Sequence, residues 1–140
     1  RFVFISPEDL RLPRYVKTES LEPTHQVYKE TDDLETELPG LDVLYMTPIQ
    51  QERFFSEEEY LRLKGCYQLD EAMLKLAPPD MPVLHPLPRI DEIKLDVDND
   101  PRAAYFDQVH NGVYIRMAII LALLGIPNPV TGKIVLNGKE

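Results

Sequence analysis

Short runs of consecutive apolar residues recur along the chain, and polar, proline-rich segments separate them. The clearest runs are Phe2–Ile5, Val43–Met46 and Val83–Leu84, and a weaker one lies at Val27–Tyr28. Continuous apolar runs, in contrast to alternating ones, are typical of strands that are buried on both faces of a parallel sheet. These runs therefore predict the strands of a parallel sheet.

The polar segments between the runs carry helix signals. Thr31, Ser56 and Asp70 each have a side chain that can cap a helix, and each precedes a segment that we expect to be a short helix. The longest and most apolar segment, Gly112–Leu124, predicts the last helix, with Asn111 as its cap. Strands that alternate with helices predict an α/β fold: an open, mostly parallel sheet with helices on both faces, in a Rossmann-like three-layer αβα arrangement.

The composition limits the classes of protein and partner. With 140 residues, 44% of them hydrophobic and 28% charged, the chain is long enough for one globular domain with its own core. A formal net charge of −9 opposes binding to nucleic acid and to anionic membranes. The single Cys66 cannot form an internal disulfide, and no apolar run reaches the length of a membrane span. We therefore expect a cytoplasmic protein with no nucleic-acid and no membrane partner.

The side chains that most often carry catalysis form no recognisable pattern. The chain has three histidines, His25, His85 and His110. They have no metal-ligand spacing to one another or to the cysteine, so each is expected to have a structural or surface role, and no metal site is predicted. Glycine-rich phosphate loops and nucleophile motifs are absent from the sequence. Acidic pairs such as Asp98 and Asp100 are interpreted as solvated faces or helix ends.

Two loops, Thr47–Phe55 and His85–Arg89, each follow a predicted strand. The carboxyl ends of parallel strands meet at one edge of the sheet, where α/β proteins bind ligands. In the second loop Pro86 and Pro88 have no N–H group, and their φ is fixed. The carbonyls nearby are therefore not expected to pair with the backbone of a neighbouring strand. Such carbonyls can accept hydrogen bonds from a ligand, and the two loops together predict one ligand crevice. A plain proline-rich turn is the alternative interpretation of the second loop.

Several motifs stand in a fixed order along the chain. They are FVFISPEDLRLP at 2–13, LYMT at 44–47, Gln50, ERF at 52–54, LHPLPRID at 84–91 and YFDQVHNG at 105–112. Together they resemble the catalytic chain of the aspartate carbamoyltransferase family, in its aspartate-binding domain. The resemblance extends from Phe2 to about Leu124.

The resemblance implies a transferase that moves the carbamoyl group of carbamoyl phosphate to the amino group of L-aspartate, in pyrimidine biosynthesis. The family uses no metal or organic cofactor and works by orienting its substrates and stabilising the departing phosphate. By this resemblance the backbone carbonyls of Leu87 and Pro88 would hold the carbamoyl nitrogen, next to a cis peptide bond between them. Gln50 would contact aspartate, and Glu52 and Arg53 would lock the mobile loop when two domains close. No catalytic residue is expected within this chain.

The resemblance also implies that the chain holds only part of an active site. The family's Ser-x-Arg-Thr-Arg phosphate loop, its carbamoyl-phosphate domain and the first strand of its aspartate-binding domain have no counterpart here. The family's site also borrows residues from a neighbouring subunit of a trimer. We therefore expect an aspartate-binding domain over 1–125 and a tail or linker over 126–140. We expect activity only with the missing domain in a homotrimer, with the last helix packed towards that domain.

Pro48 departs from the family's pattern, which places an arginine there to clamp a carboxylate of aspartate. Losing a charge-assisted contact costs roughly 1.5–3 kcal/mol, and leaving a carboxylate buried and unpaired costs about 3–5 kcal/mol. Four interpretations stay open. The protein could use another acceptor amine, or it could be a catalytically silent relative or assembly domain. The change could also be deliberate, or a neighbouring lysine or arginine could take over the role.

Overall fold

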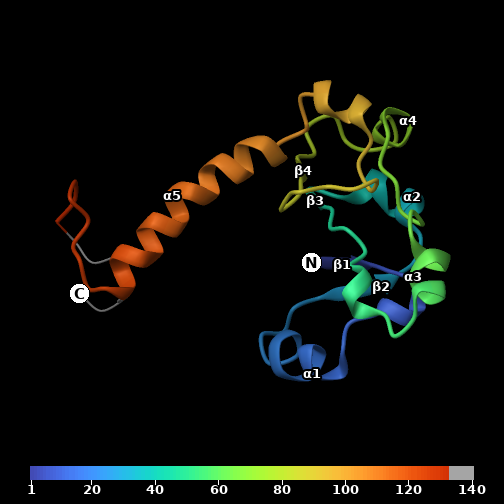
Figure 1. Cartoon of the computed structure of the whole chain (residues 1–140), viewed down its shortest axis with the longest axis horizontal. Helices are drawn as coiled ribbons and strands as arrows, with labels where there is room; N and C mark the ends of the chain where they lie inside the picture. The colour runs from blue at the N-terminus through green and yellow to red at the C-terminus, as the bar shows by residue number, and fades with distance from the viewer. Residues whose placement is uncertain (133–140) are drawn as a thin grey trace.

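The computed structural model describes residues 1–132, in which short parallel strands alternate with helices (Figure 1). The side chain of Arg53 also lies outside the described part. The strands are β1 (Phe2–Ile5), β2 (Tyr28–Thr31), β3 (Leu44–Tyr45) and β4 (Val83–Leu84). The α-helices are α1 (Arg14–Val16), α2 (Leu34–Glu37), α3 (Glu57–Leu63), α4 (Glu71–Leu74) and α5 (Tyr105–Leu123). Further 3₁₀ or π turns lie at Glu8–Leu10, Lys17–Leu21, Leu38–Gly40, Gln51–Arg53 and Leu95–Asn99.

All the paired strands of the described residues run parallel. β1 pairs with β2, and β3 pairs with β4 so that Leu44 lies opposite Val83. The predicted α/β class with parallel strands is confirmed, although within residues 1–132 the hydrogen-bonded ladders form two separate two-stranded sheets. Pro82 and Pro86 flank β4, and because proline has no N–H, they keep this strand short.

The apolar core lies around β3 and β4. It joins side chains from α2, α4, both strands and the start of α5. The largest fully buried side chains are Leu38, Leu69, Leu74, Met81, Val83, His85, Val97 and Tyr105. Close packing of this kind fixes the positions of the strand ends, and therefore of the loops that leave them.

Of the three caps predicted for the short helices, two are confirmed. Ser56 Oγ accepts a hydrogen bond from the N–H of Glu59 at 3.2 Å, and Asp70 Oδ1 accepts one from the N–H of Met73 at 2.8 Å. The prediction for Thr31 is wrong, because Thr31 is the last residue of β2 and lies opposite Ile5 of β1 in the sheet. Asp33 caps α2 instead.

Helix α5 begins earlier than the sequence predicted. Asn111 lies inside the helix and does not cap it, so this prediction is wrong. The helix begins beside β4, because the N–H of Ala104 donates to the carbonyl of Val83 at 3.0 Å, and Tyr105 is fully buried. From there α5 projects away from the strands and the other helices (Figure 1). Its apolar side chains are therefore largely uncovered, with Ile120 56% and Leu123 74% exposed.

Asp98 lies in the first turn of the 3₁₀ helix Leu95–Asn99, which agrees with one of the two interpretations of this acidic pair, whereas Asp100 follows that helix. The other interpretation, a solvated face, is wrong, because both acids are paired. Asp98 accepts hydrogen bonds from Arg89, and Asp100 accepts them from the N–H, Nε and Nη2 of Arg102 at 2.8–2.9 Å. Arg102 also donates to the carbonyl of Leu74 at 2.8 Å. Asp98 therefore joins segments nine positions apart, and Asp100 orients Arg102, which reaches Leu74 across 28 positions.

The segment predicted as a tail, 126–140, is described only to Gly132. In this part Asn128 Oδ1 accepts hydrogen bonds from the N–H groups of Val130 and Thr131, at 2.8 and 3.1 Å. Residues 133–140 lie outside the described part of the chain. Among the described helices, none has the length and apolar character needed to cross a membrane.

Candidate functional site

A groove opens where β1, β3 and β4 end, and the loops that follow these three strands line it. It gathers most of the residues singled out from the sequence, namely Pro48, Gln50, Glu52, Leu87 and Pro88. The predicted crevice between the two loops is thus present, and the loop after β1 adds a third wall. The reason is topological, because the carboxyl ends of parallel strands point the same way. Gln50 and Glu52 are exposed, while Pro48 and Leu87 are half-buried.

Two residues of the loop after β4, Leu87 and Pro88, line this groove and have unpaired carbonyls. Leu87 has a positive φ of 49°, and its bond to Pro88 is cis. The N–H of Leu87 donates to His85 Nδ1 at 2.8 Å, whereas within residues 1–132 no donor reaches the carbonyl oxygen of Leu87 or Pro88. Two acceptors at the rim of a groove can receive N–H groups of a bound molecule.

His85 and Glu92 form a buried pair beneath this loop. His85 Nε2 lies 2.6 Å from Glu92 Oε1, and the two residues are 0% and 5% exposed. Glu92 Oε2 also accepts the N–H groups of Ile90 and Asp91, at 3.1 and 3.0 Å. Burial by itself raises the pKa of Glu92, but these hydrogen bonds outweigh it and leave the pKa below its ordinary value. The sequence predicted a structural or surface role for His85 but gave no sign of its partner.

Arg89 anchors the far end of the same loop. Its guanidinium pairs with Asp98 through both terminal nitrogens and lies 5.7 Å from the centre of the Tyr105 ring. Tyr105 Oη also donates to Asp98. The ion pair with Arg89 keeps the pKa of Asp98 below its usual value, and burial together with Asp98 raises the pKa of Tyr105 to about 12. The network ties the loop to the first residue of α5.

Gln108 of α5 provides a second link to the strands. Its Oε1 accepts the backbone N–H of His85 at 2.9 Å, and its Nε2 donates to Tyr45 Oη at 3.2 Å. It therefore connects the helix to the ends of both β3 and β4. Gln108 belongs to the YFDQVHNG motif, but its contacts with His85 and Tyr45 could not be predicted from the sequence, because they depend on where α5 starts.

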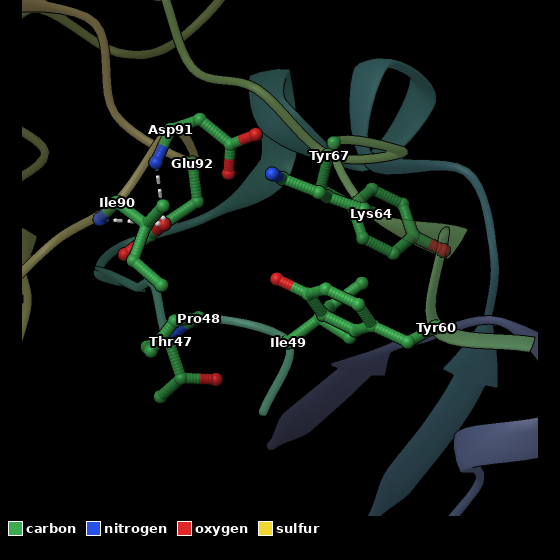
Figure 2. A pocket seen from close by; sticks show the side chains of 10 residues that line it. Thr47, Pro48, Ile49, Tyr60, Lys64, Tyr67, Ile90, Asp91 and Glu92 are labelled. Carbon is green, nitrogen blue, oxygen red and sulfur yellow. Dashed lines mark hydrogen bonds between the residues drawn. The ribbon is translucent and has the colours of Figure 1, made fainter. Parts of the chain in front are cut away.

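A small pocket adjoins the groove and shares Pro48 with it. Figure 2 shows the Lys64 ammonium and the Tyr60 hydroxyl pointing into this pocket, with the Asp91 carboxylate facing them. Lys64 directly follows α3 and is exposed, and it makes no ion pair with any residue in the described range. A cation thus lines the same pocket as Pro48, the position that departs from the family's pattern.

Comparison with known proteins identifies the fold and the family. Residues 1–123 match the model for the aspartate/ornithine-binding domain of aspartate and ornithine carbamoyltransferases. The chain belongs to this family. It is 51% identical over 126 residues to the aspartate carbamoyltransferase catalytic subunit of Clostridium botulinum (strain Langeland), which covers 90% of this chain. It is 52% identical over all 140 residues to that of Bifidobacterium longum subsp. infantis. The chain spans only 41% and 43% of the length of these two relatives.

Solved structures agree with this family assignment and with the three-layer αβα fold. Aspartate transcarbamoylase from Trypanosoma cruzi, in complex with carbamoyl phosphate and aspartate, superposes with a TM-score of 0.75 at 36% identity. It covers 84% of this chain, which matches 39% of that structure. The catalytic subunit of the M. jannaschii enzyme has a TM-score of 0.73 at 39% identity, and covers 88% of this chain and 39% of its own. The predicted fold class and the resemblance are both confirmed.

Proposed function

We propose that this chain is the aspartate-binding part of an aspartate carbamoyltransferase. The complete enzyme would transfer the carbamoyl group from carbamoyl phosphate to the amino group of L-aspartate, a step of pyrimidine biosynthesis. The observation that carries the proposal is the groove at the ends of β1, β3 and β4, which joins unpaired carbonyls to polar side chains. A relative that superposes closely was solved with both carbamoyl phosphate and aspartate bound.

Each predicted site residue has a role in this proposal. The carbonyls of Leu87 and Pro88 accept hydrogen bonds from the carbamoyl nitrogen, and Gln50 contacts the aspartate. Glu52 and Arg53, which lie in the 3₁₀ turn after β3, lock the loop when the domains close. Transfer then depends on orienting the two substrates and on charge stabilisation at the departing phosphate, for which no metal or organic cofactor is needed.

The phosphate-binding part of the site comes from outside this chain in the proposal. Residues 1–125 form the aspartate-binding domain, 126–140 form a tail or linker, and a carbamoyl-phosphate domain and trimer partners complete the site. The uncovered apolar side chains of α5, such as Ile120 and Leu123, give the missing domain a surface to bury. The chain alone is then inactive, and the assembled enzyme acts in the cytoplasm.

Pro48 supports a second candidate function. Without a guanidinium at this position, the protein could be a silent relative or assembly domain, or could carbamoylate a different amine. Lys64, which lines the pocket next to Pro48, is the neighbouring cation that could instead pair with a substrate carboxylate. A lysine reaches a carboxylate as a point charge, whereas arginine binds it through two parallel hydrogen bonds. Aspartate would then bind more weakly than with arginine at position 48.

Calorimetry separates these candidates. We would insert this chain into the Bifidobacterium longum enzyme in place of the matching segment, and titrate the chimera with N-phosphonacetyl-L-aspartate. The same titration would follow on Pro48→Arg and on Lys64→Met, with Lys75→Met as the matched control. Lys75 is exposed and pairs with Glu71 on α4, outside the groove. Tight binding that Lys64→Met weakens and Lys75→Met leaves unchanged supports aspartate as the acceptor. Binding by Pro48→Arg alone favours the silent relative or another amine.

A further inference from the structure

The buried pair of His85 and Glu92 holds both ends of the carbonyl loop at once. At the front, His85 Nδ1 accepts the N–H of Leu87 at 2.8 Å. At the back, Glu92 Oε2 accepts the N–H groups of Ile90 and Asp91, at 3.1 and 3.0 Å. The two side chains join each other at 2.6 Å, so one continuous set of hydrogen bonds closes the base of the loop.

The direction of these hydrogen bonds fixes the state of the His85 ring. Nδ1 accepts a hydrogen bond from the Leu87 N–H, so Nδ1 carries no hydrogen of its own. The hydrogen of the neutral ring is therefore assigned to Nε2, which donates a hydrogen bond to the Glu92 carboxylate. Because the ring cannot rotate without breaking both contacts, it sets the orientation of the peptide that begins at Leu87.

The pair makes no contact with the carbonyl groups of Leu87 and Pro88, the two loop residues that line the groove. Between the fixed ends, within residues 1–132, the carbonyl oxygens of Leu87 and Pro88 accept no hydrogen bond. Arg89 is held separately by Asp98. The N–H groups of Leu87, Ile90 and Asp91 are thus used to fix the shape of the loop, while the two carbonyls remain available to a ligand.

We propose that His85 and Glu92 are positioning residues for the carbamoyl group, because they hold the Leu87 and Pro88 carbonyls in the orientation that receives its N–H groups. The inference rests on the proposed function, and it assigns a role to two residues that touch no substrate. A positioning role differs from a purely structural role in one respect. Loss of the hydrogen bond between Leu87 N–H and His85 Nδ1 should lower kcat/KM for carbamoyl phosphate even where the stability of the fold is unaffected.

Two substitutions of His85 separate the two ends of the pair. Asparagine places an oxygen near the position of Nδ1, so His85→Asn keeps an acceptor for Leu87 N–H and loses the contact with Glu92. Glutamine reaches further, so His85→Gln can still donate an amide N–H to Glu92 but offers no acceptor near Leu87. His110→Asn is the matched control, because His110 is exposed on α5 and contacts only Tyr114 among the described side chains.

The test is steady-state kinetics of the chimera with the Bifidobacterium longum enzyme, together with the thermal midpoint of each variant. For His85→Gln we expect kcat/KM for carbamoyl phosphate to fall roughly tenfold or more, since small misplacements of a binding group cost up to about a hundredfold. The aspartate KM at saturating carbamoyl phosphate should change less than about threefold. His85→Asn should keep kcat/KM within about threefold of the unsubstituted chimera, even where its thermal midpoint is lower.

Each result has a distinct meaning. Equal losses of kcat/KM in His85→Asn and His85→Gln, or an unchanged kcat/KM for carbamoyl phosphate in both, would overturn the inference and leave a structural role. If His85→Gln does not fold, Glu92→Gln provides the second test, because glutamine has a single acceptor oxygen and cannot accept both from His85 Nε2 and from the N–H groups of Ile90 and Asp91. The same selective fall in kcat/KM for carbamoyl phosphate is expected there, and its absence would overturn the inference. An inactive unsubstituted chimera would overturn the proposed function itself.

Discussion

Replacing Asp100 by asparagine tests the electrostatics of the fold most sharply. The Asp100 carboxylate accepts three hydrogen bonds from Arg102, from its backbone N–H, Nε and Nη2, at 2.8–2.9 Å. Arg102 in turn donates to the carbonyls of Leu74 and Pro78, at 2.8 and 3.1 Å. The pair therefore ties the end of α4 to the segment that leads into α5. Asp100→Asn keeps the size of the side chain and removes its charge.

The expected loss of stability follows from the pKa of Asp100. The hydrogen bonds from Arg102 lower this pKa from 3.8 to about 2, although burial opposes the shift. A carboxyl group with a lower pKa in the folded state stabilises the fold at pH values above its unfolded pKa, and this contribution is lost as pH falls towards the folded pKa. The difference corresponds to roughly 2 kcal/mol at pH 7 and at pH 4, and to about half of that at pH 3.

Urea unfolding followed by far-UV circular dichroism measures this loss. We would compare the unsubstituted chain with Asp100→Asn at pH 7, 4 and 3, with Asp80→Asn as the control at an exposed acid. The free-energy difference between Asp100→Asn and the unsubstituted chain should be about 2 kcal/mol at pH 7 and close to half of that at pH 3. The control should change stability by less than about 0.5 kcal/mol. A difference that stays constant between pH 7 and pH 3 would refute the reasoning.

Three further predictions concern the cap, the Arg89 network and the groove. Asp70→Ala should lower the free energy of unfolding by about 1 kcal/mol, because α4 loses the acceptor for Met73 N–H, and urea unfolding checks this. Tyr105→Phe should cost about 1.5–3 kcal/mol in the same assay, because a buried hydroxyl no longer donates to the charged Asp98; a loss below about 0.5 kcal/mol would contradict the network. In the chimera, Pro48→Arg should lower the aspartate KM by about tenfold or more, since a charge-assisted contact is worth at least about 1.5 kcal/mol. An unchanged KM would mean that position 48 does not face the substrate.

The elements defined by local chemistry could be predicted from the sequence. Phe2–Ile5 and the caps Ser56 and Asp70 depend on neighbouring residues, and the structure contains each of them. The crevice was also predictable, since a parallel sheet brings its loops to one edge. The start of α5 was missed because Ala104 and Tyr105 are fixed by contacts with β4 and the core, which a local pattern does not reveal.

The parts of the candidate site that were missed all depend on contacts between residues that local patterns do not connect. His85 and Glu92 are seven positions apart, and only the fold of the loop brings them together. Gln108 meets the backbone of His85 across 23 positions, and Arg102 meets Leu74 across 28. Lys64 comes close to Pro48 because α3 returns to the groove. The residue types were visible in the sequence, but their partners were not.

The most direct test of the proposed function is the reaction itself. The chimera with the Bifidobacterium longum enzyme would be incubated with carbamoyl phosphate and L-aspartate, and separately with L-ornithine, and the carbamoylated product would be measured. The proposed function predicts N-carbamoyl-L-aspartate in the first incubation and no carbamoylated ornithine in the second. The 140-residue chain alone should give neither product. No carbamoylated aspartate from the folded, unsubstituted chimera would contradict the proposal, and product from Pro48→Arg alone would favour a silent relative or another acceptor amine.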